Sequence, residues 1–527
     1  MRGLAAVLQE WEAVIGLEVH AELTTLNTKM FCSCPVDFGA PPNTHVCPVC
    51  LGLPGALPVP NRAAIESIVL AGLATGCEIE KRSMFYRKNY FYPDMSKNFQ
   101  TTQGPVAFCM RGSLLLEVAG RSSRERSCLD GTLPLPEAYA QEGYCTVVGI
   151  TRIHLEEDAG KMVHVGGTDG RISGADYSLV DYNRCGTPLI ELVTEPDLRT
   201  PEEARLFLQA LRQVYLTLGI SDCSMEEGSL RCDGNVSLRR RGAAAYGTKT
   251  ELKNMNSFKN LHDGLAYEIC RQAEVLESGG TVAQETRHWE PASKRTISMR
   301  VKETADDYRL FPEPDLAPYD LSESFIEAVR SRLPELPDAK RARLMKSHGL
   351  SYLDACALAA DAETTAFFDA AIAASDVASA PAAASASAVA KPVANLLIND
   401  VAAYLNTHAL TLAQTRLTPA HLAELAGLVA EGTISSSQAK AVFARTAAEG
   451  VSPARVVADE GMEQVSDESA IEQVASAILA QFPDKAEEYR AGKTGLLGFF
   501  VGQAMKATAG QGNPKLINEA FVRLLEG

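Results

Sequence analysis

The stretch PLIELVTEPDLRTPEEARLFLQALRQVYLTL, residues 188–218, predicts a short strand followed directly by a helix. Leu189–Val193 is an apolar run with β-branched members, which favours a strand. Thr200 can cap a helix whose first turn holds Pro201 and two glutamates, and the following residues repeat their apolar positions at helical spacing. The two elements together predict a mixed α/β domain.

The same mixture of elements extends over residues 1–315. Short apolar runs recur at Val14–Val19, Val147–Ile153 and Asn235–Leu238, and Gly, Pro and Asn separate them. This is the pattern of strands joined by turns. We therefore expect the first part of the chain to be one strand-rich α/β domain.

Beyond Pro318 the composition becomes that of helices. Leu, Ala, Glu and Arg predominate at helical spacing, which predicts an all-α domain over residues 316–452. Within it, residues 370–391 are rich in Ala and Ser, and we interpret them as a flexible low-complexity insert. Gly450 and Pro453 indicate a boundary to a small helical tail, residues 453–527.

The bulk composition excludes several classes of protein. The 527 residues are 46% hydrophobic and 22% charged, which is ordinary for a globular chain of two to four domains. No apolar run of about 18 residues and no secretory signal is recognisable. The net charge of −16 argues against a protein that coats nucleic acid indiscriminately, although a local basic patch can still bind RNA.

Acidic residues occupy strand positions that a metal ion would explain. Glu18 and His20 share a face of the first strand, because alternate residues point the same way. Glu157 lies on the apolar face of a second strand, and Glu191 lies within an apolar third strand. A buried carboxylate needs a partner, and Mg²⁺ prefers oxygen ligands. Each strand alone is explained by an exposed face or an acidic turn, but the three together favour one shared site.

Two further segments carry residues suited to phosphate. Residues 87–100 interleave cations, Lys97 among them, with aromatic side chains, a combination that can hold a phosphate or a base. In residues 226–237, Arg231 could neutralise phosphate charge, and Asp233 could take part in metal or nucleotide binding. An aromatic structural loop and a solvated loop are the alternatives for these two segments.

The cysteines suggest a structural zinc site. Cys32 and Cys34 form one close pair, Cys47 and Cys50 form another, and twelve residues separate the pairs. This spacing is typical of a tetrahedral four-cysteine zinc site, and free thiols in a reduced protein are the alternative. The 13 cysteines are otherwise scattered, so we expect a reducing compartment rather than a disulfide framework.

Taken in order, these segments resemble the B subunits of the tRNA-dependent amidotransferases, the heterotrimeric enzymes that act on Glu-tRNA(Gln) and Asp-tRNA(Asn). The resemblance covers nearly the whole chain. It is carried by the ordered motifs IGLEVHAEL, NTKMFC, CPVCLGLPG, RKNYFYPDMSKNFQ, HLEEDAGK, SLVDYNRCGTPLIE, EGSLRCDGNVSLR and YRLFPEPDL. No single motif is decisive, but the series is specific. The stretches at residues 117–144 and 370–391 stand out from it as inserts.

The resemblance implies an α+β fold in three parts: a cradle-shaped catalytic domain over residues 1–315, a helical domain, and a tail like the stand-alone YqeY proteins that binds tRNA. ATP and Mg²⁺ would be used in the cradle. The catalytic residues and Mg²⁺ ligands would be Glu18, His20, Glu157 and Glu191. Contacts to the nucleotide or to the tRNA acceptor end would come from Lys97, Arg231 and Asp233.

The implied enzyme is a carbon–nitrogen ligase with glutamine as the amide donor. ATP would activate the tRNA-bound glutamate as an acyl phosphate, and ammonia would then displace phosphate. Because no glutaminase site is recognisable here, the ammonia would come from a separate amidase (glutaminase) chain. A small third chain would join the two in the heterotrimer.

Three alternatives remain at this stage. The chain could be a non-catalytic tRNA-binding scaffold, although a complete set of acidic ligands argues against that. It could be a zinc hydrolase, although a four-cysteine zinc normally leaves no position for substrate. Its substrate could be Asp-tRNA(Asn) rather than Glu-tRNA(Gln). A mitochondrion or chloroplast is expected if the source is eukaryotic, and the bacterial cytoplasm otherwise, with no membrane association.

Overall fold

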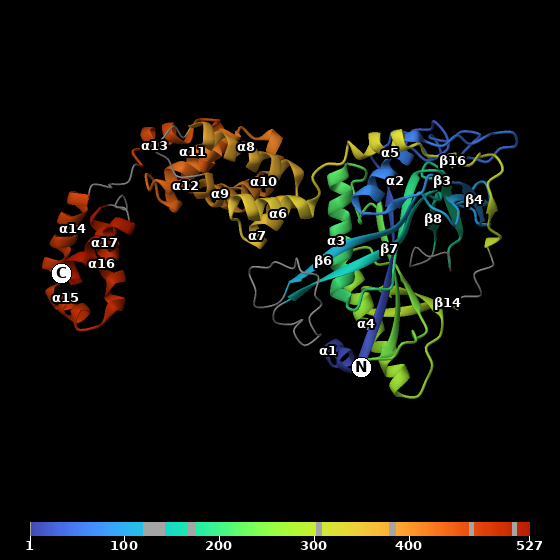
Figure 1. Cartoon of the computed structure of the whole chain (residues 1–527), viewed down its shortest axis with the longest axis horizontal. Coiled ribbons are helices and arrows are strands. Elements are labelled where there is room, and N and C mark those ends of the chain that lie inside the picture. Colours follow the sequence, from blue (N-terminus) through green and yellow to red (C-terminus); the bar gives the residue numbers. More distant parts are fainter. Residues whose placement is uncertain are drawn as a thin grey trace. The chain divides into compact units, whose positions relative to one another are not determined.

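The computed structural model describes residues 2–119, 143–166, 174–301, 308–378, 386–462, 468–508 and 514–526. Two compact units divide the chain, Met1–Leu336 and Pro337–Gly527 (Figure 1). The first unit contains all of the described strands, and the second unit, in its described part, is helical. The mixed domain followed by a helical region confirms the fold class expected from the sequence.

Among the described residues, twelve strands form one large sheet in the first unit. Its main path runs β14-β13-β12-β11-β1-β10-β7-β5-β4-β15, and β6 pairs with both β7 and β2. The strands of the path have these bounds: β14 Arg295–Val301, β13 Glu285–Glu290, β12 Thr250–Lys253, β11 Leu230–Arg240, β1 Trp11–Glu22, β10 Pro188–Thr194, β7 Gly143–Glu157, β5 Phe99–Gln103, β4 Phe85–Asn89 and β15 Phe311–Pro312. The two joined at β7 are β6 Cys109–Ala119 and β2 Glu78–Ile79.

Two small ribbons complete the strands of this unit. One pairs β3 (Arg82–Ser83) with β16 (Tyr319–Asp320), and the other pairs β8 (Lys161–Val165) with β9 (Tyr177–Asp181). The long β6–β7 ladder includes both ends of the insert expected at residues 117–144, because Glu117 pairs with Cys145. Residues 120–142 of that insert lie outside the described residues.

Strand β1 is central to the sheet and alternates as the sequence predicts. Leu17, Val19 and Ala21 are buried, whereas the intervening Glu18 and His20 are half-buried. The antiparallel neighbours β10 and β11 flank β1 on its two sides. All four predicted apolar runs lie inside β1, β7, β10 and β11.

Helices cover the apolar face of this sheet. They are α1 (Leu4–Glu10), α2 (Arg62–Ala74), α3 (Pro201–Leu218), α4 (Phe258–Glu277) and α5 (Glu323–Arg330). Helix α2 packs on β6 and β7, α3 on β1 and β6, and α4 on β11 and β14 (Figure 1). Their buried side chains form one core with the sheet, so the polar face of the central strands is left for function.

Helix α3 begins where the sequence predicts. Thr200 accepts a hydrogen bond from the Glu203 backbone N–H, and the Glu203 side chain accepts from the Thr200 N–H, which completes a capping box. Pro201 occupies the first turn, and Gly219 ends the helix in the left-handed region with φ 65°.

The second unit contains two hydrophobic cores. One is built from the helices between Leu344 and Val457, and the other from those between Ile471 and Leu525. The α-helices are α6 Pro337–His348, α7 Tyr352–Ala359, α8 Ala362–Ala378, α9 Ala386–Asn395, α10 Ala402–His408, α11 Pro419–Ala430, α12 Ser436–Glu449, α13 Pro453–Glu460, α14 Glu468–Gln481, α15 Pro483–Arg490, α16 Leu497–Ala507 and α17 Pro514–Glu526. A π-helical segment, Leu396–Val401, joins α9 to α10, and short 3₁₀ turns lie at Leu412–Gln414 and Thr494–Leu496.

The Ala/Ser-rich stretch at residues 370–391 differs from the flexible insert that we expected. Its described residues end α8 and begin α9, and Ala371, Ile372, Val389 and Ala390 are buried in the core of this part. Alanine is the strongest helix former, so low complexity here is compatible with packed helices. Residues 379–385, which include Pro381, lie outside the described residues.

Among the described helices, none combines the length and the apolar character needed to cross a bilayer.

Candidate functional site

A cluster of acidic and imidazole side chains lies on the polar face of the central strands. In the antiparallel register His20 of β1 stands opposite Glu191 of β10, and their side chains approach to 3.3 Å between His20 Nε2 and Glu191 Oε2. Glu18, two residues earlier on the same face, lies 3.6 Å from His20 Nε2. The structure therefore brings together three of the four predicted metal ligands.

Strand β7 adds two residues that the sequence analysis did not select. His154 stands opposite Glu191, and Glu156 follows on the same face. His154 Nε2 lies 3.5 Å from Glu191 Oε2, and Glu156 Oε1 lies 3.6 Å from His20 Nε2. We call Glu18, His20, His154, Glu156 and Glu191 the acidic cluster.

The acidic cluster contains more negative than positive charge. Burial, followed by the nearby Glu191, raises the pKa of Glu156 to about 7 and also raises the pKa of Glu18. Burial alone would lower the pKa of His20, but Glu191, Glu156 and Glu18 together raise it to about 9. Burial lowers the pKa of His154 to about 4, so that ring is neutral near pH 7.

The donor atoms of this cluster fit a divalent cation. The ligand atoms of Glu18, His20 and Glu191 all lie within 4.8 Å of one another, as do those of His154, Glu156 and Glu191. Carboxylate oxygens suit Mg²⁺, and imidazole nitrogen is accepted more readily by Mn²⁺ and similar ions. Burial of several carboxylates around one cationic imidazole is costly unless positive charge offsets them.

Several cationic side chains lie near the acidic cluster or act on it. Lys88 of β4 acts on Glu191 through its charge, and Arg152 of β7 lies 4.0 Å from Glu191. On β11, Arg231 donates to Asp158 at 2.7 Å. Asp233 faces Glu18 across the β1–β11 register and accepts from Lys253 at 2.5 Å. The predicted Arg231 and Asp233 are therefore beside the cluster.

Glu157 and Lys97 lie elsewhere. Alternation along β7 turns Glu157 away from Glu156, onto the apolar face as the sequence indicates. There it forms a buried ion pair with Lys97 and accepts from the Thr101 backbone N–H at 2.8 Å. The partner that this buried carboxylate needs is thus a lysine, and the structure does not place either residue in the acidic cluster.

The four predicted cysteines gather at a second site. The sulfur atoms of Cys32, Cys34, Cys47 and Cys50 all lie within 4.8 Å of one another. Four thiolates bound tetrahedrally at 2.3 Å from one zinc ion would be about 3.8 Å apart, so the arrangement fits zinc. The Cys47 N–H donates to the Cys50 sulfur at 3.1 Å, a contact that would help to orient that ligand.

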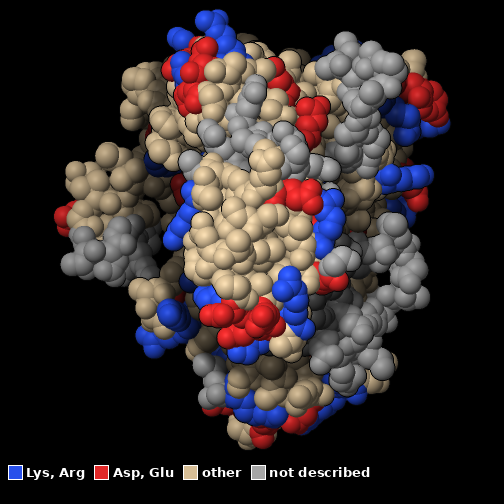
Figure 2. Space-filling view, turned by 90° about the vertical axis from the view of Figure 1, so that its left-hand side faces the viewer, with Lys and Arg blue, Asp and Glu red and all other residues tan. Residues whose placement is uncertain are grey.

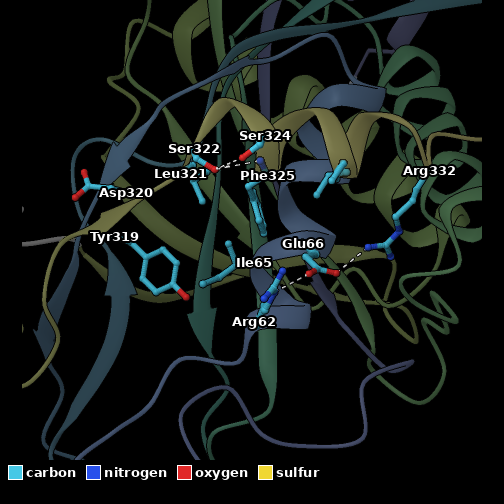
Figure 3. A pocket seen from close by; sticks show the side chains of 12 residues that line it. Arg62, Ile65, Glu66, Tyr319, Asp320, Leu321, Ser322, Ser324, Phe325 and Arg332 are labelled. Carbon is cyan, nitrogen blue, oxygen red and sulfur yellow. Dashed lines mark hydrogen bonds and ion pairs between the residues drawn. The ribbon is translucent and has the colours of Figure 1, made fainter.

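A cavity in the first unit lies apart from the acidic cluster. It has a volume of about 490 Å³ and lies between α2 and α5, with Ile65, Tyr319 and Phe325 in its wall (Figure 3). Its charged side chains are already paired, because Glu66 binds both Arg62 and Arg332.

The C-terminal helices present a mixed surface. In the face drawn in Figure 2, the coloured Lys and Arg residues are interspersed with Asp and Glu around uncharged areas. Lys493 pairs with Glu488 at 3.1 Å and Arg523 with Glu472 at 3.5 Å. Both cations are therefore already paired with carboxylates.

Comparison with known proteins gave consistent matches over nearly the whole chain. Residues 13–327 match the model of the GatB/GatE catalytic domain, and residues 381–525 match that of the GatB domain. Among curated proteins, the chain is similar to the B subunit of the aspartyl/glutamyl-tRNA(Asn/Gln) amidotransferase of Geotalea daltonii, with 47% identity over 98% of this chain and 100% of that protein. The proteins of the same name from Brevibacillus brevis (46%; 98% and 99% covered) and Synechocystis sp. (45%; 99% and 99% covered) are similar too.

Proposed function

Because this chain belongs to the GatB/GatE family, together with the B subunits of the aspartyl/glutamyl-tRNA amidotransferases, we propose that it amidates glutamate carried on tRNA(Gln). The reaction makes it a carbon–nitrogen ligase with glutamine as the amide donor. Asp-tRNA(Asn) is a second substrate within the same proposal. The observation that carries the proposal is the acidic cluster, with Arg152 4.0 Å from Glu191 and Arg231 opposite His20 on the neighbouring strand.

The chemistry requires activation because a carboxylate is a poor acyl donor. The γ-carboxylate of the tRNA-bound glutamate attacks the γ-phosphate of ATP, which gives an acyl phosphate and ADP. Ammonia then attacks the acyl carbon and releases phosphate. Catalysis of such a transfer is mostly positioning and offset of negative charge.

Different residues in and around the acidic cluster would position the reactants and offset negative charge. Glu18, His20 and Glu191 would hold Mg²⁺, with His154 and Glu156 beside them; a bound Mg²⁺ would offset charge on the transferred phosphoryl group. Arg152 lies 4.0 Å from Glu191 and would meet phosphate oxygens there, and the charge of Lys88, which lowers the pKa of Glu191, would act on the same oxygens. Arg231 donates to Asp158 and would face the acceptor end or the nucleotide.

We propose a structural Zn²⁺ at Cys32, Cys34, Cys47 and Cys50. A four-cysteine zinc is closed to substrate, so it would stabilise the loops of residues 29–61 and take no part in the chemistry. The described cysteines form no disulfide, and we place the chain in a reducing compartment. The bacterial relatives favour the bacterial cytoplasm over an organelle.

The ammonia comes from a partner. We propose a heterotrimer in which one partner is an amidase that hydrolyses glutamine, and the other is a small protein that joins the two larger chains. The misacylated tRNA would reach the acidic cluster with its acceptor end, and the C-terminal helices α14–α17 would meet the body of the tRNA.

The deciding experiment is ATP-dependent conversion of Glu-tRNA(Gln) to Gln-tRNA(Gln) by the reconstituted heterotrimer. Glu191→Gln should bind tRNA but form no acyl phosphate, measured as tRNA-dependent release of ADP. The matched control is Glu195→Gln, four residues away, whose exposed side chain accepts a hydrogen bond from the Thr151 hydroxyl. Full activity of Glu191→Gln would refute the catalytic assignment and favour a scaffold role for the chain.

A further inference from the structure

Two buried lysines lie between the four-cysteine site and the acidic cluster, and the proposed reaction uses neither. Lys29 is fully buried, and the side chain of Lys97 is 9% exposed. A buried ammonium group is costly unless it is paired and hydrogen-bonded. Each lysine therefore needs a partner that offsets the cost of burying its ammonium group.

Lys29 faces the cysteines. Its Nζ donates to the Tyr182 carbonyl at 3.1 Å and approaches the Cys50 sulfur at 3.7 Å. Lys29 is therefore in hydrogen-bond contact with one cysteine of the four-cysteine site. Four thiolates around a divalent ion carry a net charge of −2, so occupancy of that site would place negative charge beside the Lys29 ammonium group.

The turn that carries Cys50 packs directly on Lys97. Gly52 adopts φ +68°, and a Cβ there would lie 2.7 Å from Lys97 Cγ. Ser96 Oγ donates to the Cys50 carbonyl at 2.6 Å. The segment of Ser96 and Lys97 is therefore held against the cysteine turn by close packing and by a hydrogen bond.

Lys97 links the cysteine turn to strand β7, because it also contacts the end of that strand. It pairs with Glu157, whose backbone carbonyl also accepts from Gln100 Nε2 at 2.8 Å. Glu157 is the neighbour of Glu156 in the acidic cluster and of Asp158, which holds Arg231. A shift of Lys97 would consequently move the end of β7, and with it the carboxylate that faces His20.

We propose that Lys97 and Glu157 are positioning residues that couple metal occupancy of the four-cysteine site to the divalent-cation affinity of the acidic cluster. The inference depends on the cation site of the proposed function and adds its regulation. Such coupling is reciprocal, so a cation at the acidic cluster also strengthens zinc retention by the cysteines.

The test measures cation binding by the full chain without ATP or tRNA. Mn²⁺ serves as the probe, titrated by electron paramagnetic resonance against zinc-loaded and zinc-stripped protein, and Glu191→Gln supplies the blank for Mn²⁺ bound elsewhere. Zinc removal should weaken Mn²⁺ binding by about 5-fold or more, within the usual range of coupling between sites. Lys97→Met should bind Mn²⁺ weakly in both states and lose the dependence on zinc.

A matched control separates coupling from general loss of structure. Lys81→Met removes an exposed lysine that pairs with Glu323, and it should keep the zinc dependence of the wild type. A second readout applies if zinc removal unfolds the first unit. In the zinc-loaded state, Lys97→Met, Glu157→Gln and their double variant should all weaken Mn²⁺ binding by the same factor, because the pair acts as one unit.

The outcomes that overturn the proposal differ from those that overturn the function. Equal Mn²⁺ affinity with and without zinc, or additive effects of the two substitutions, would overturn the coupling alone. No Mn²⁺ binding by zinc-loaded wild-type protein would overturn the cation assignment in the proposed function, and the coupling with it.

Discussion

Substitution by Gln should change the stability of the protein in opposite directions at two adjacent glutamates at the end of β7, Glu156 and Glu157. Glu156 faces the acidic cluster, where burial and Glu191 raise its pKa to about 7 from an ordinary value of 4.5. Glu157 faces the other way and is ion-paired with Lys97. We predict that Glu156→Gln stabilises the cation-free protein above pH 7 and that Glu157→Gln destabilises it.

The magnitude for Glu156 follows from linkage between protonation and folding. A carboxyl whose pKa is raised in the folded state binds its proton more tightly there, so its penalty is absent below pH 4.5 and complete above pH 7. The value of about 7 corresponds to a cost of at most about 3 kcal/mol at pH 8. Gln should remove this cost at pH 8 and change little at pH 5.

The magnitude for Glu157 follows from the buried lysine that it would leave behind. Removal of one partner of a buried ion pair costs about 3–5 kcal/mol, because the other charge stays buried without compensation. Gln keeps the size of the side chain and can still accept from the Thr101 N–H. The expected loss of stability in Glu157→Gln therefore results mainly from the missing negative charge.

Tryptophan fluorescence in urea is a suitable assay for both variants. The only two tryptophans, Trp11 and Trp289, lie in the first unit, so their signal follows the unit that contains the site. With added Mg²⁺ the wild type should gain stability, by about 2.7 kcal/mol at 100 times its dissociation constant, and Glu156→Gln should gain less. Destabilisation by Glu156→Gln at pH 8 without Mg²⁺, or stabilisation by Glu157→Gln, would refute the assignment of the two faces.

Three further predictions concern other parts of the molecule. Thr200→Ala removes the cap of α3 and should cost about 1 kcal/mol in the same fluorescence assay; an unchanged urea midpoint would contradict the capping box. Phe368→Ala opens a cavity in the first core of the helical unit and should cost about 3–5 kcal/mol, seen by circular dichroism; a matching shift of the tryptophan transition would contradict separate cores. Cys47→Ser should lower the zinc content measured by mass spectrometry, whereas Cys356→Ser, outside the cluster, should not.

Alternation within a single strand was enough to predict which face of the sheet a site residue occupies. Alternation alone placed Glu18 with His20 and correctly turned Glu157 toward the apolar side. The motif series gave the family and the order of domains. These features are local, so a single segment contains the information that determines them.

The composition of the cluster could not be predicted in the same way, because it depends on register between strands that are distant in the sequence. His154 joins the site only because it stands opposite Glu191, and that pairing follows from the assembled sheet. Lys97 lies 60 residues before Glu157, and no local pattern identifies it as the partner of that carboxylate. The Ala/Ser-rich stretch shows a different limit, since its composition fits flexible chain and packed helix alike.

Three consecutive residues at the end of β7 connect these observations physically. Glu156 turns to the acidic cluster, Glu157 to Lys97 and the cysteine turn, and Asp158 to Arg231. A strand end that met only the cluster could move to relieve repulsion among its carboxylates. Contacts on the opposite face and at the next residue oppose such a movement, and a bound cation would offset the negative charge that remains. We infer that the anchoring groups are as necessary for cation affinity as the ligands, because they keep the ligands together in its absence.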